Sequence, residues 1–439
     1  MRISVLGRSV ILVSVTPEAA AEPALRHNRP YVLLMAGRTT QLIGSGIGSF
    51  AVPLIAYALT GSVAQAGVIA AIGQIGGLVM TLPTGVLADR TDRRKIIVAG
   101  AAIGAACWGW IAVAGFLGWL TGWQLAAALF VSSVIGTAVG SAEAAAIPYV
   151  VPVTQLPQAM AVVEGRGAVA SLLGGPVGGL LYSVARMIPF LANAIGEFAI
   201  LVSTFFIRVP LNDHHDGPRE HPLRSLAEGL RFCWSVPLFR AAIGLFAMVN
   251  LTINAVVIAI TLHLVRDHTT PFLIGLLDFV MGAATLIGSL FAGRLLNRFR
   301  VATITITALA LLSVGIAIMA LAQSYPVYLI MFGVPILLAP ALNAGLGGYV
   351  AAVTPHHLQG RLSSVLSLTF LLSAPLSPVV GSQLLAHFGL GVTLWVLAAA
   401  LAVTTVLVGF MRSLRQVGLP STWVHHKITW PAPGESPER

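Results

Sequence analysis

Six ionisable residues lie inside otherwise apolar stretches of this sequence, where a charged side chain is costly and is therefore a candidate for function. The acidic members are Glu143, Glu164, Glu197 and Asp278, and the basic members are Arg38 and Arg166. Burial disfavours the charged form of a carboxyl group, so such a group can take up and release a proton. A carboxylate and a guanidinium at the same depth can instead neutralise each other as an ion pair.

Long apolar segments must position these residues. Hydrophobic residues make up 57% of the 439 residues, and only 9% are charged. A helix of about twenty apolar residues can cross the ~30 Å hydrocarbon core of a bilayer, and lipid offers no partners to the edge of a strand. The predicted spans are 31–59, 64–87, 96–118, 123–148, 159–183, 187–207, 239–264, 271–292, 301–322, 325–350, 363–385 and 390–411. We therefore expect an all-α integral membrane protein with twelve transmembrane helices.

Basic residues predict the orientation, because Lys and Arg gather in cytoplasmic loops. If the N-terminus is cytoplasmic, Arg186 and Arg266 fall on the opposite face and Arg38 and Arg166 fall within spans. All other members of the 25 Lys and Arg residues then lie on the cytoplasmic side. Both termini are predicted to be cytoplasmic, and the net charge of +10 reflects membrane topology rather than binding to nucleic acid.

A polar stretch divides the spans into two sets of six. The expected organisation is a cytosolic tail (1–29), an N-terminal six-helix bundle (30–207), a cytoplasmic linker with an amphipathic helix (208–238), a C-terminal six-helix bundle (239–412) and a cytosolic tail (413–439). Residues 1–29 also loosely imitate a signal peptide, although their apolar run is short for one. The stretch Gly85–Arg90 is echoed at Gly293–Arg298, as is typical of parallel repeats in transporters.

Two motifs stand out within the first half. The charged turn Gly85-Val-Leu-Ala-Asp-Arg-Thr-Asp-Arg-Arg-Lys95 joins the second and third spans, and Gly174-Gly-Pro-Val-Gly-Gly179 lies in the fifth. Asp89 can accept hydrogen bonds from a helix N-terminus or from an arginine, and Gly85 permits close helix approach. The alternative is that the basic residues of the turn only determine the membrane topology of the chain. Proline in the second motif removes a backbone donor and kinks the helix.

Over nearly its full length the chain resembles the major facilitator superfamily, in the branch of enterobactin exporters and macrolide efflux proteins. The first motif is similar to the family's motif A, with Asp92 where the general motif has glycine. The resemblance implies two pseudo-symmetric six-helix bundles and a conformational latch formed by Gly85, Asp89, Arg90, Arg93 and Arg94. In the family the equivalent aspartate contacts the start of the eleventh span, here 361–364, and favours the outward-open state. Gly174, Gly175, Pro176, Gly178 and Gly179 resemble motif C, which is typical of antiporters.

The intramembrane charges then take expected roles. Asp278 is the first candidate for proton coupling, because its half has no evident intramembrane cation; contact with outside water is the alternative. Arg38 and Arg166 are expected to form a structural or gating network with Glu143 and Glu164, and direct proton carriage by either glutamate is the second interpretation. For Glu197 packing is expected before proton coupling, because the sixth helix of this fold flanks the cavity.

Polar residues in mostly apolar walls suit an amphiphilic organic substrate. The residues expected to face the central cavity are Gln41, Ser133, Thr137, Asn250, Asn254 and Asn343. We expect a proton-coupled exporter of a hydrophobic or amphiphilic small molecule in the cytoplasmic membrane, monomeric and without cofactor or metal. A metabolite importer or facilitator, and a membrane sensor or partner subunit that does not transport, are the alternatives. The sequence contains neither a P-loop nor a nucleophile elbow, and we do not expect an enzyme.

Overall fold

The computed structural model describes residues 25–207, 209, 231, 234–354, 356–411, 417–418 and 423. The side chains of residues 82, 85–90, 153, 237–238, 356–361, 363–364 and 366 lie outside this description, as does the predicted amphipathic helix of the linker. All regular structure in the described part of the chain is helical.

The first bundle contains six helices. They are α1 (Arg29–Thr60), α2 (Val63–Arg90), α3 (Arg93–Phe116), α4 (Gly122–Val150), α5 (Leu156–Val184) and α6 (Ile188–Phe205), with short 3-10 turns at Leu25–His27 and Val153–Gln155. Local chemistry sets their ends. The Asn28 side chain accepts a hydrogen bond from the Tyr31 backbone amide at the start of α1. Gly61 ends α1 in the left-handed conformation, with φ of 64°.

The second bundle follows the same plan with two departures. Its helices are α8 (Pro237–Arg266), α9 (Pro271–Arg298), α10 (Val301–Ala322), α11 (Tyr325–Gly333), α12 (Ala339–Val353) and α13 (His356–Phe410). A 3-10 turn at Pro335–Leu338 joins α11 to α12, so the two form one membrane crossing. Helix α13 is broken at Gly389, where φ of 75° and ψ of 171° are not helical, and it makes two crossings.

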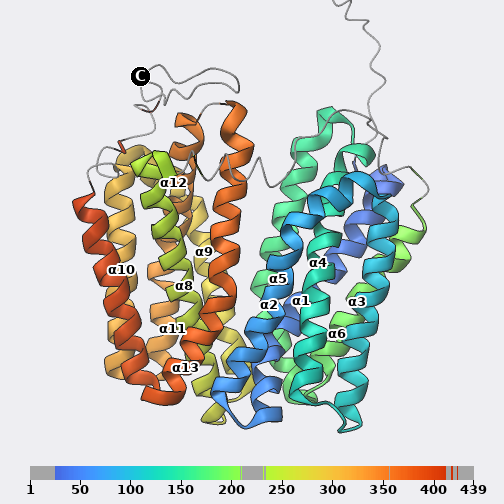
Figure 1. Ribbon diagram of the computed structural model, residues 1–439, viewed down its shortest axis with the longest axis horizontal. Coiled ribbons are helices and arrows are strands. Elements are labelled where there is room, and N and C mark those ends of the chain that lie inside the picture. The colour runs from blue at the N-terminus through green and yellow to red at the C-terminus, as the bar shows by residue number, and fades with distance from the viewer. Residues whose placement is uncertain are drawn as a thin grey trace, which may run out of the picture.

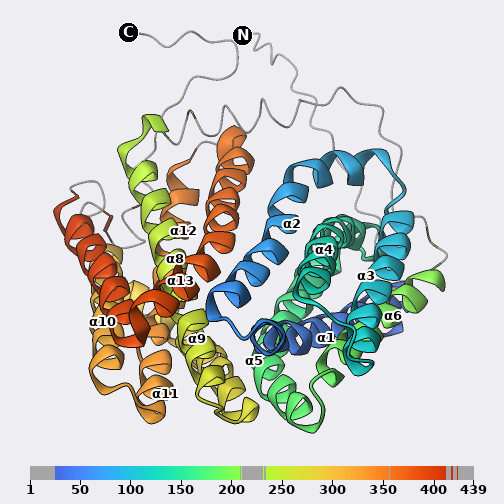
Figure 2. The same ribbon diagram turned by 60° about the horizontal axis from the view of Figure 1, so that its bottom comes forward.

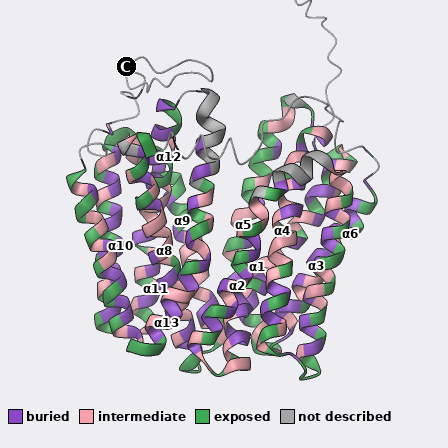
Figure 3. Cartoon of the chain, viewed as in Figure 1, coloured by how far each residue is buried: buried purple, intermediate pink, exposed green. Residues whose placement is uncertain are grey.

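The described residues thus agree with twelve crossings. Eleven segments are long and apolar enough to span a membrane, and the eleventh, Ser367–Phe410, contains the break at Gly389. Many large apolar residues are exposed, for example Leu290, which is 72% exposed, and exposed positions recur along the helices of both bundles (Figure 3). In a membrane protein such residues contact lipid. The protein is a multi-pass α-helical membrane protein.

The two bundles converge at one end of the molecule. We call the end where α1 begins the near end, and the end where α1 finishes the far end. Helix α2 packs on α13 and α5 packs on α9 across the bundle boundary, and the two bundles diverge toward the near end (Figures 1 and 2). A Cβ built on Gly67, near the start of α2, would lie 2.7 Å from the Pro378 carbonyl oxygen of α13. These tight crossings close the far end.

Candidate functional site

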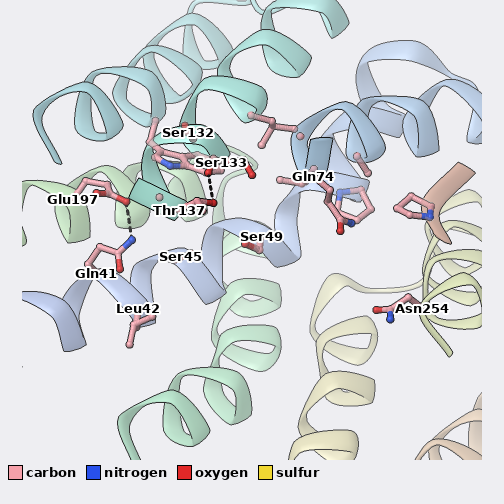
Figure 4. A pocket seen from close by; sticks show the side chains of 18 of the residues that line it. Gln41, Leu42, Ser45, Ser49, Gln74, Ser132, Ser133, Thr137, Glu197 and Asn254 are labelled. Carbon is pink, nitrogen blue, oxygen red and sulfur yellow. Dashed lines mark hydrogen bonds between the residues drawn. The ribbon is translucent and has the colours of Figure 1, made fainter. Parts of the chain in front are cut away.

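A cavity of about 590 Å³ lies between the bundles. Most of its lining comes from α1, α2 and α4, and Trp108 of α3 and Glu197 of α6 complete that side. The second bundle contributes Asn254, Val257 and Ile258 from α8 and Pro378 from α13. Figure 4 shows the polar side chains of the first bundle gathered on one side, with Asn254 across from them. The polar wall of the cavity therefore belongs almost wholly to one bundle.

Helix α1 presents a polar stripe to this cavity. Arg38, Gln41, Ser45 and Ser49 all line it and follow one another at intervals of three or four residues. Such spacing places side chains on one face of a helix. Of these four, the sequence-based expectation for the cavity named only Gln41. The signal was present in the sequence as a polar stripe of helical period, but small serines in an apolar helix are not distinctive individually.

Four of the six residues predicted to face the cavity can be placed directly. Gln41, Ser133, Thr137 and Asn254 line it. Asn250 lies one turn away from Asn254 and accepts a hydrogen bond from the Ser373 hydroxyl of α13 at 3.1 Å. Asn343 is exposed on α12 and does not border this cavity. Ser132, Gln74 and Trp108 line the cavity without having been predicted.

Glu197 borders the cavity, which differs from the expectation that it would serve in packing. Its Oε1 accepts a hydrogen bond from Gln41 Nε2 at 2.8 Å (Figure 4). Glu197 is 8% exposed. A Cβ built on Gly104 of α3 would lie 3.0 Å from the Glu197 Oε2, so a larger residue there would crowd this side chain. Among the described residues no Lys, Arg or His lies within 4.0 Å of the Glu197 carboxylate.

Arg38, Glu143 and Arg166 form a buried ion cluster. Glu143 Oε2 lies 2.7 Å from Arg38 Nε, and Glu143 Oε1 lies 2.5 Å from an Arg166 terminal nitrogen. The carboxylate side chain is 4% exposed, and the three residues come from α1, α4 and α5. The three groups of this cluster carry a formal net charge of +1. A negative charge on Glu197, which interacts electrostatically with Arg38, would neutralise this net charge.

Glu164 does not join this cluster. It lies two residues from Arg166 on α5 but on the exposed side of the helix, because residues two apart point in different directions. The sequence places Glu164 and Glu143 at similar depth, and only the packing of α5 against α1 distinguishes them. Of the four acidic candidates, Glu143 is ion-paired, Glu164 is exposed, Glu197 borders the cavity and Asp278 lies elsewhere.

Asp278 lies where the two bundles cross. Its Cβ would be 2.6 Å from a Cβ built on Gly175 of α5, and the Gly275 carbonyl oxygen would be equally close. Asp278 belongs to α9, two turns from the far end of that helix. It has no hydrogen-bond or ion-pair partner among the residues that the structure describes. Asp278 is partly exposed at this contact between α5 and α9.

The glycines of α5 serve two different contacts. A Cβ on Gly174 or Gly178 would approach the α1 backbone to 3.0 Å, at Gly46 and Ile47. A Cβ on Gly175 or Gly179 would instead meet α9, which belongs to the other bundle. Pro176 lies inside α5, between Gly175 and Gly178 in the sequence. The stretch Gly174–Gly179 thus allows α5 to pack closely on a neighbour within its own bundle and on one across the boundary.

The charged turn between α2 and α3 is described only in part. The side chains of Gly85, Asp89 and Arg90 lie outside the described residues, as does that of residue 361, so the predicted latch is not visible. Asp92 accepts a hydrogen bond from the Arg94 backbone amide and caps α3. Arg93 donates to the Ala145 carbonyl of α4 at 3.0 Å, and Arg94 to the Phe205 carbonyl of α6 at 2.7 Å. Both arginines hold α3 against the ends of neighbouring helices, where a cation is favourable.

The described residues contain no group of three or more His, Cys, Asp or Glu side chains that could hold a metal ion. Within the described part of the chain, the arrangement offers instead a cavity with one polar wall, and two carboxyl groups, those of Glu197 and Asp278, that have no cation at ion-pair distance. A cavity of this kind can bind a mostly apolar molecule.

Comparison with solved structures identifies the same arrangement elsewhere. A bacterial homologue of the iron transporter ferroportin, solved in an inward-facing state, superposes with a TM-score of 0.71 over 88% of this chain and 98% of the other, at 16% identity. The nucleoside transporter NupG superposes with a TM-score of 0.70 over 89% of this chain and 99% of that chain, at 11% identity. At these identities the likeness concerns the fold.

Two sequence relatives match different shares of the chain. The chain is 24% identical over 408 residues to the multidrug efflux pump Tap of Mycobacterium tuberculosis, covering 89% of this chain and 95% of the relative. It is 26% identical over 275 residues to the macrolide efflux protein A of Streptococcus pyogenes, covering 60% of this chain and 66% of the relative. The family model of the Major Facilitator Superfamily matches residues 34–258 and 246–427. Matching both bundles in turn, it shows that this chain belongs to the major facilitator superfamily.

Proposed function

We propose that this protein is a secondary active transporter that exports a hydrophobic or amphiphilic small molecule by proton-coupled alternating access. The observation that carries the proposal is the cavity of about 590 Å³ between the bundles, with a polar wall on one bundle and apolar groups such as Val257 and Ile258 on the other. Such a lining favours an amphiphile over a sugar or an inorganic ion. The similarity to proteins named for multidrug and macrolide efflux supports the direction of transport.

The distribution of basic residues supports a cytoplasmic near end. Arg93, Arg94 and Lys95 lie at that end, and Arg298 and Arg300 lie at the corresponding end of the second bundle. The far end carries Arg186 and Arg266. Because the bundles converge at the far end, this orientation makes the conformation inward-facing. Export then requires the far end to open after the near end closes, and the motif A aspartate, Asp89, would latch the closed near end against 361–364.

Two carboxyl groups are suited to proton coupling. Glu143 is already ion-paired with the guanidinium groups of Arg38 and Arg166. Glu197 borders the cavity, and Asp278 lies at the crossing of α5 and α9, with no cation at ion-pair distance from either in the described part of the chain. Separation of the bundles at the far end would expose Asp278 to external water. We therefore keep Asp278 as the first coupling residue and place Glu197 second.

Energised efflux from cells tests the proposal. Cells expressing the wild type are loaded with a panel of fluorescent amphiphiles, and efflux is followed with and without a protonophore. We expect efflux that the protonophore abolishes and that Asp278→Asn reduces strongly at unchanged expression. Glu164→Gln, which changes an exposed carboxylate on α5, serves as the matched control and should transport normally.

The alternatives give different outcomes. Protonophore-sensitive efflux that survives Asp278→Asn but fails in Glu197→Gln would move coupling to the cavity. Accumulation of the probe in place of efflux would contradict export and favour an importer. Efflux that is insensitive to the protonophore in every variant would contradict proton coupling.

A further inference from the structure

A second large hollow lies on the membrane side of the first bundle. It has a volume of about 700 Å³, and its described lining comes mainly from α2 and α4, with Thr60 at the end of α1 and Gln383 of α13. We call it the α2–α4 groove. Val68 and Ile72 of α2 line this groove, whereas Gly73 and Gln74 line the central cavity. A helix turns 100° per residue, so these two pairs lie on different faces of α2.

The groove is separate from the central cavity. A Cβ built on Gly73 of α2 would lie 3.0 Å from the Leu129 Cβ of α4, and one on Gly77 would lie 3.1 Å from the Ser133 hydroxyl. These close approaches form a wall between the two spaces. The groove therefore opens sideways, and Val68 and Val131 on its lining are 39% and 38% exposed. Since the helices span the membrane, this opening faces the hydrocarbon core.

Polarity changes along the groove. Its far end is formed by Thr60 at the end of α1, Gln65 and Trp123 near the starts of α2 and α4, and Gln383 of α13. Ile72, Phe130 and Val131 form its deeper part, about two turns further into the membrane. The groove is thus polar at the depth of lipid head groups and apolar at the depth of acyl chains, and none of the described residues that line it is charged.

The polar groups of the rim are available for a ligand. Neither the Gln65 side-chain amide nor that of Gln383 has a hydrogen-bond partner among the described residues. Trp123 is 72% exposed, and an exposed indole at a membrane interface offers its N–H to lipid polar groups. Ester carbonyls of a glycerolipid lie at this depth and accept such hydrogen bonds.

The groove also continues the contact between the bundles. Gln383 follows Ser382, which lies with Pro378 at the tight crossing of α13 over Gly67. Gln383 therefore adds one residue of the second bundle to a groove whose other described lining residues belong to the first. Opening of the far end would carry Gln383 away from α2 and leave the groove incomplete.

We propose that the α2–α4 groove is a binding site for one membrane glycerolipid of the leaflet at the far end, whose occupancy stabilises the conformation with the far end closed. The acyl chain lies along Val68, Ile72 and Phe130, and the ester region meets the amides of Gln65 and Gln383. Because the lining is uncharged, the site selects for chain and ester and not for the charge of the head group.

The test uses full-length protein purified in a mild detergent. Native mass spectrometry should detect one phospholipid retained per wild-type chain, and this adduct should be lost in Ala127→Phe, which fills the groove. Ala399→Phe is the matched control, because Ala399 is an exposed alanine on the lipid-facing part of α13, away from the groove. The control should retain the adduct. Equal retention in Ala127→Phe and Ala399→Phe would overturn the proposal.

A second measurement does not depend on a groove-filling variant. Phosphatidylcholine with brominated chains is titrated into wild-type protein and into Trp123→Phe in detergent, and tryptophan fluorescence is recorded. We expect a saturable quenching component in the wild type that is missing in Trp123→Phe, and brominated phosphatidylglycerol should half-saturate at a similar concentration. Quenching without a saturable component, or a strong preference for the anionic lipid, would contradict the site as described.

The conformational part has its own readout. Accessibility to a membrane-impermeant thiol reagent is measured at a cysteine placed at Leu54, which borders a smaller hollow between the bundles near the far end. Added lipid should lower the labelling rate in an otherwise wild-type background and have no effect in Ala127→Phe. A labelling rate that lipid leaves unchanged in both would reject the stabilising role.

Discussion

The two bundles share one architecture but differ in where they keep polar groups. The first bundle holds the ion cluster of Arg38, Glu143 and Arg166 and nearly the whole polar wall of the cavity. The second holds a neutral network, in which Ser373 donates to Asn250 and Asn254 donates to the Asn250 carbonyl, and it places the partly exposed carboxyl group of Asp278 at the contact with α5. The difference teaches that the helical plan is repeated in both bundles, whereas most of the polar lining of the cavity is built on one of them.

The largest effect should come from removing the centre of the charged cluster. Glu143→Ala leaves two buried guanidinium groups facing each other, and breaking a buried pair in this way costs about 3–5 kcal/mol. We expect a collapse in the yield of folded protein and a large drop in melting temperature. Glu164→Ala, on the exposed side of α5, is the control. If Glu143→Ala is as stable as Glu164→Ala, the first bundle is not organised around this cluster.

The next effect concerns the contact between the bundles. In Gly175→Val the new side chain meets Asp278 and the Gly275 carbonyl oxygen, and overpacking of this kind costs about 1–3 kcal/mol. A change of ~1.4 kcal/mol alters an equilibrium constant tenfold. The ratio of molecules with a closed far end to those with an open one should therefore fall by up to about a hundredfold. Labelling of the Leu54→Cys reporter should therefore accelerate.

Gly167→Val is the control for that experiment. A Cβ on Gly167 of the same helix meets nothing within 4 Å, so the reporter should label at the wild-type rate. Equal acceleration in both variants would show that any bulk on α5, and not the crossing at Gly175, controls the far end.

A smaller difference should separate the two walls of the cavity. Gln41→Ala removes a polar group that also orients Glu197, whereas Asn254→Ala removes an amide that is already engaged with Asn250. A hydrogen bond contributes about 0.5–1.5 kcal/mol, so the apparent KM for an exported probe should rise about two- to tenfold in Gln41→Ala. In Asn254→Ala it should change less. The reverse order would place recognition on the second bundle.

The smallest effect is expected within the neutral network. Ser373→Ala removes the hydroxyl donor to Asn250, which should lower the free energy of unfolding by about 1 kcal/mol. Thermal unfolding in detergent measures this change, and Thr404→Ala, whose hydroxyl bonds only to its own helix, provides the baseline. A destabilisation as large as that of Glu143→Ala would remove the contrast between the bundles.

Much of the fold could be predicted from the sequence because lipid allows few solutions. Apolar segments long enough to span a membrane predict twelve crossings. The similarity of Gly85–Arg90 to Gly293–Arg298 predicts that the chain consists of two repeated halves. The interruption of the tenth crossing at Pro335–Leu338 was not predicted, since hydropathy reports apolar length and not the local hydrogen-bond pattern.

The candidate site was harder to predict. Which face of a membrane helix turns toward a cavity depends on packing between helices, and apolar residues occupy both faces. Glu197 was assigned to packing because its helix lies outside the central set, but the glycine at position 104 leaves space for its side chain to reach the cavity. The pairing of Glu143 with Arg38 and Arg166, and the exclusion of Glu164, likewise depend on how α1 and α4 meet α5.

The alternating glycines of α5 have a consequence for how this protein tolerates change. Gly174 and Gly178 face α1, a contact inside one bundle that is kept throughout a transport cycle, whereas Gly175 and Gly179 face α9, a contact that must form and separate. Saturation mutagenesis should divide these four glycines into two classes. Substitutions in the first class reduce the amount of protein in the membrane, and substitutions in the second leave the amount unchanged and reduce turnover. Abundance and activity can therefore be altered independently at adjacent positions of one helix.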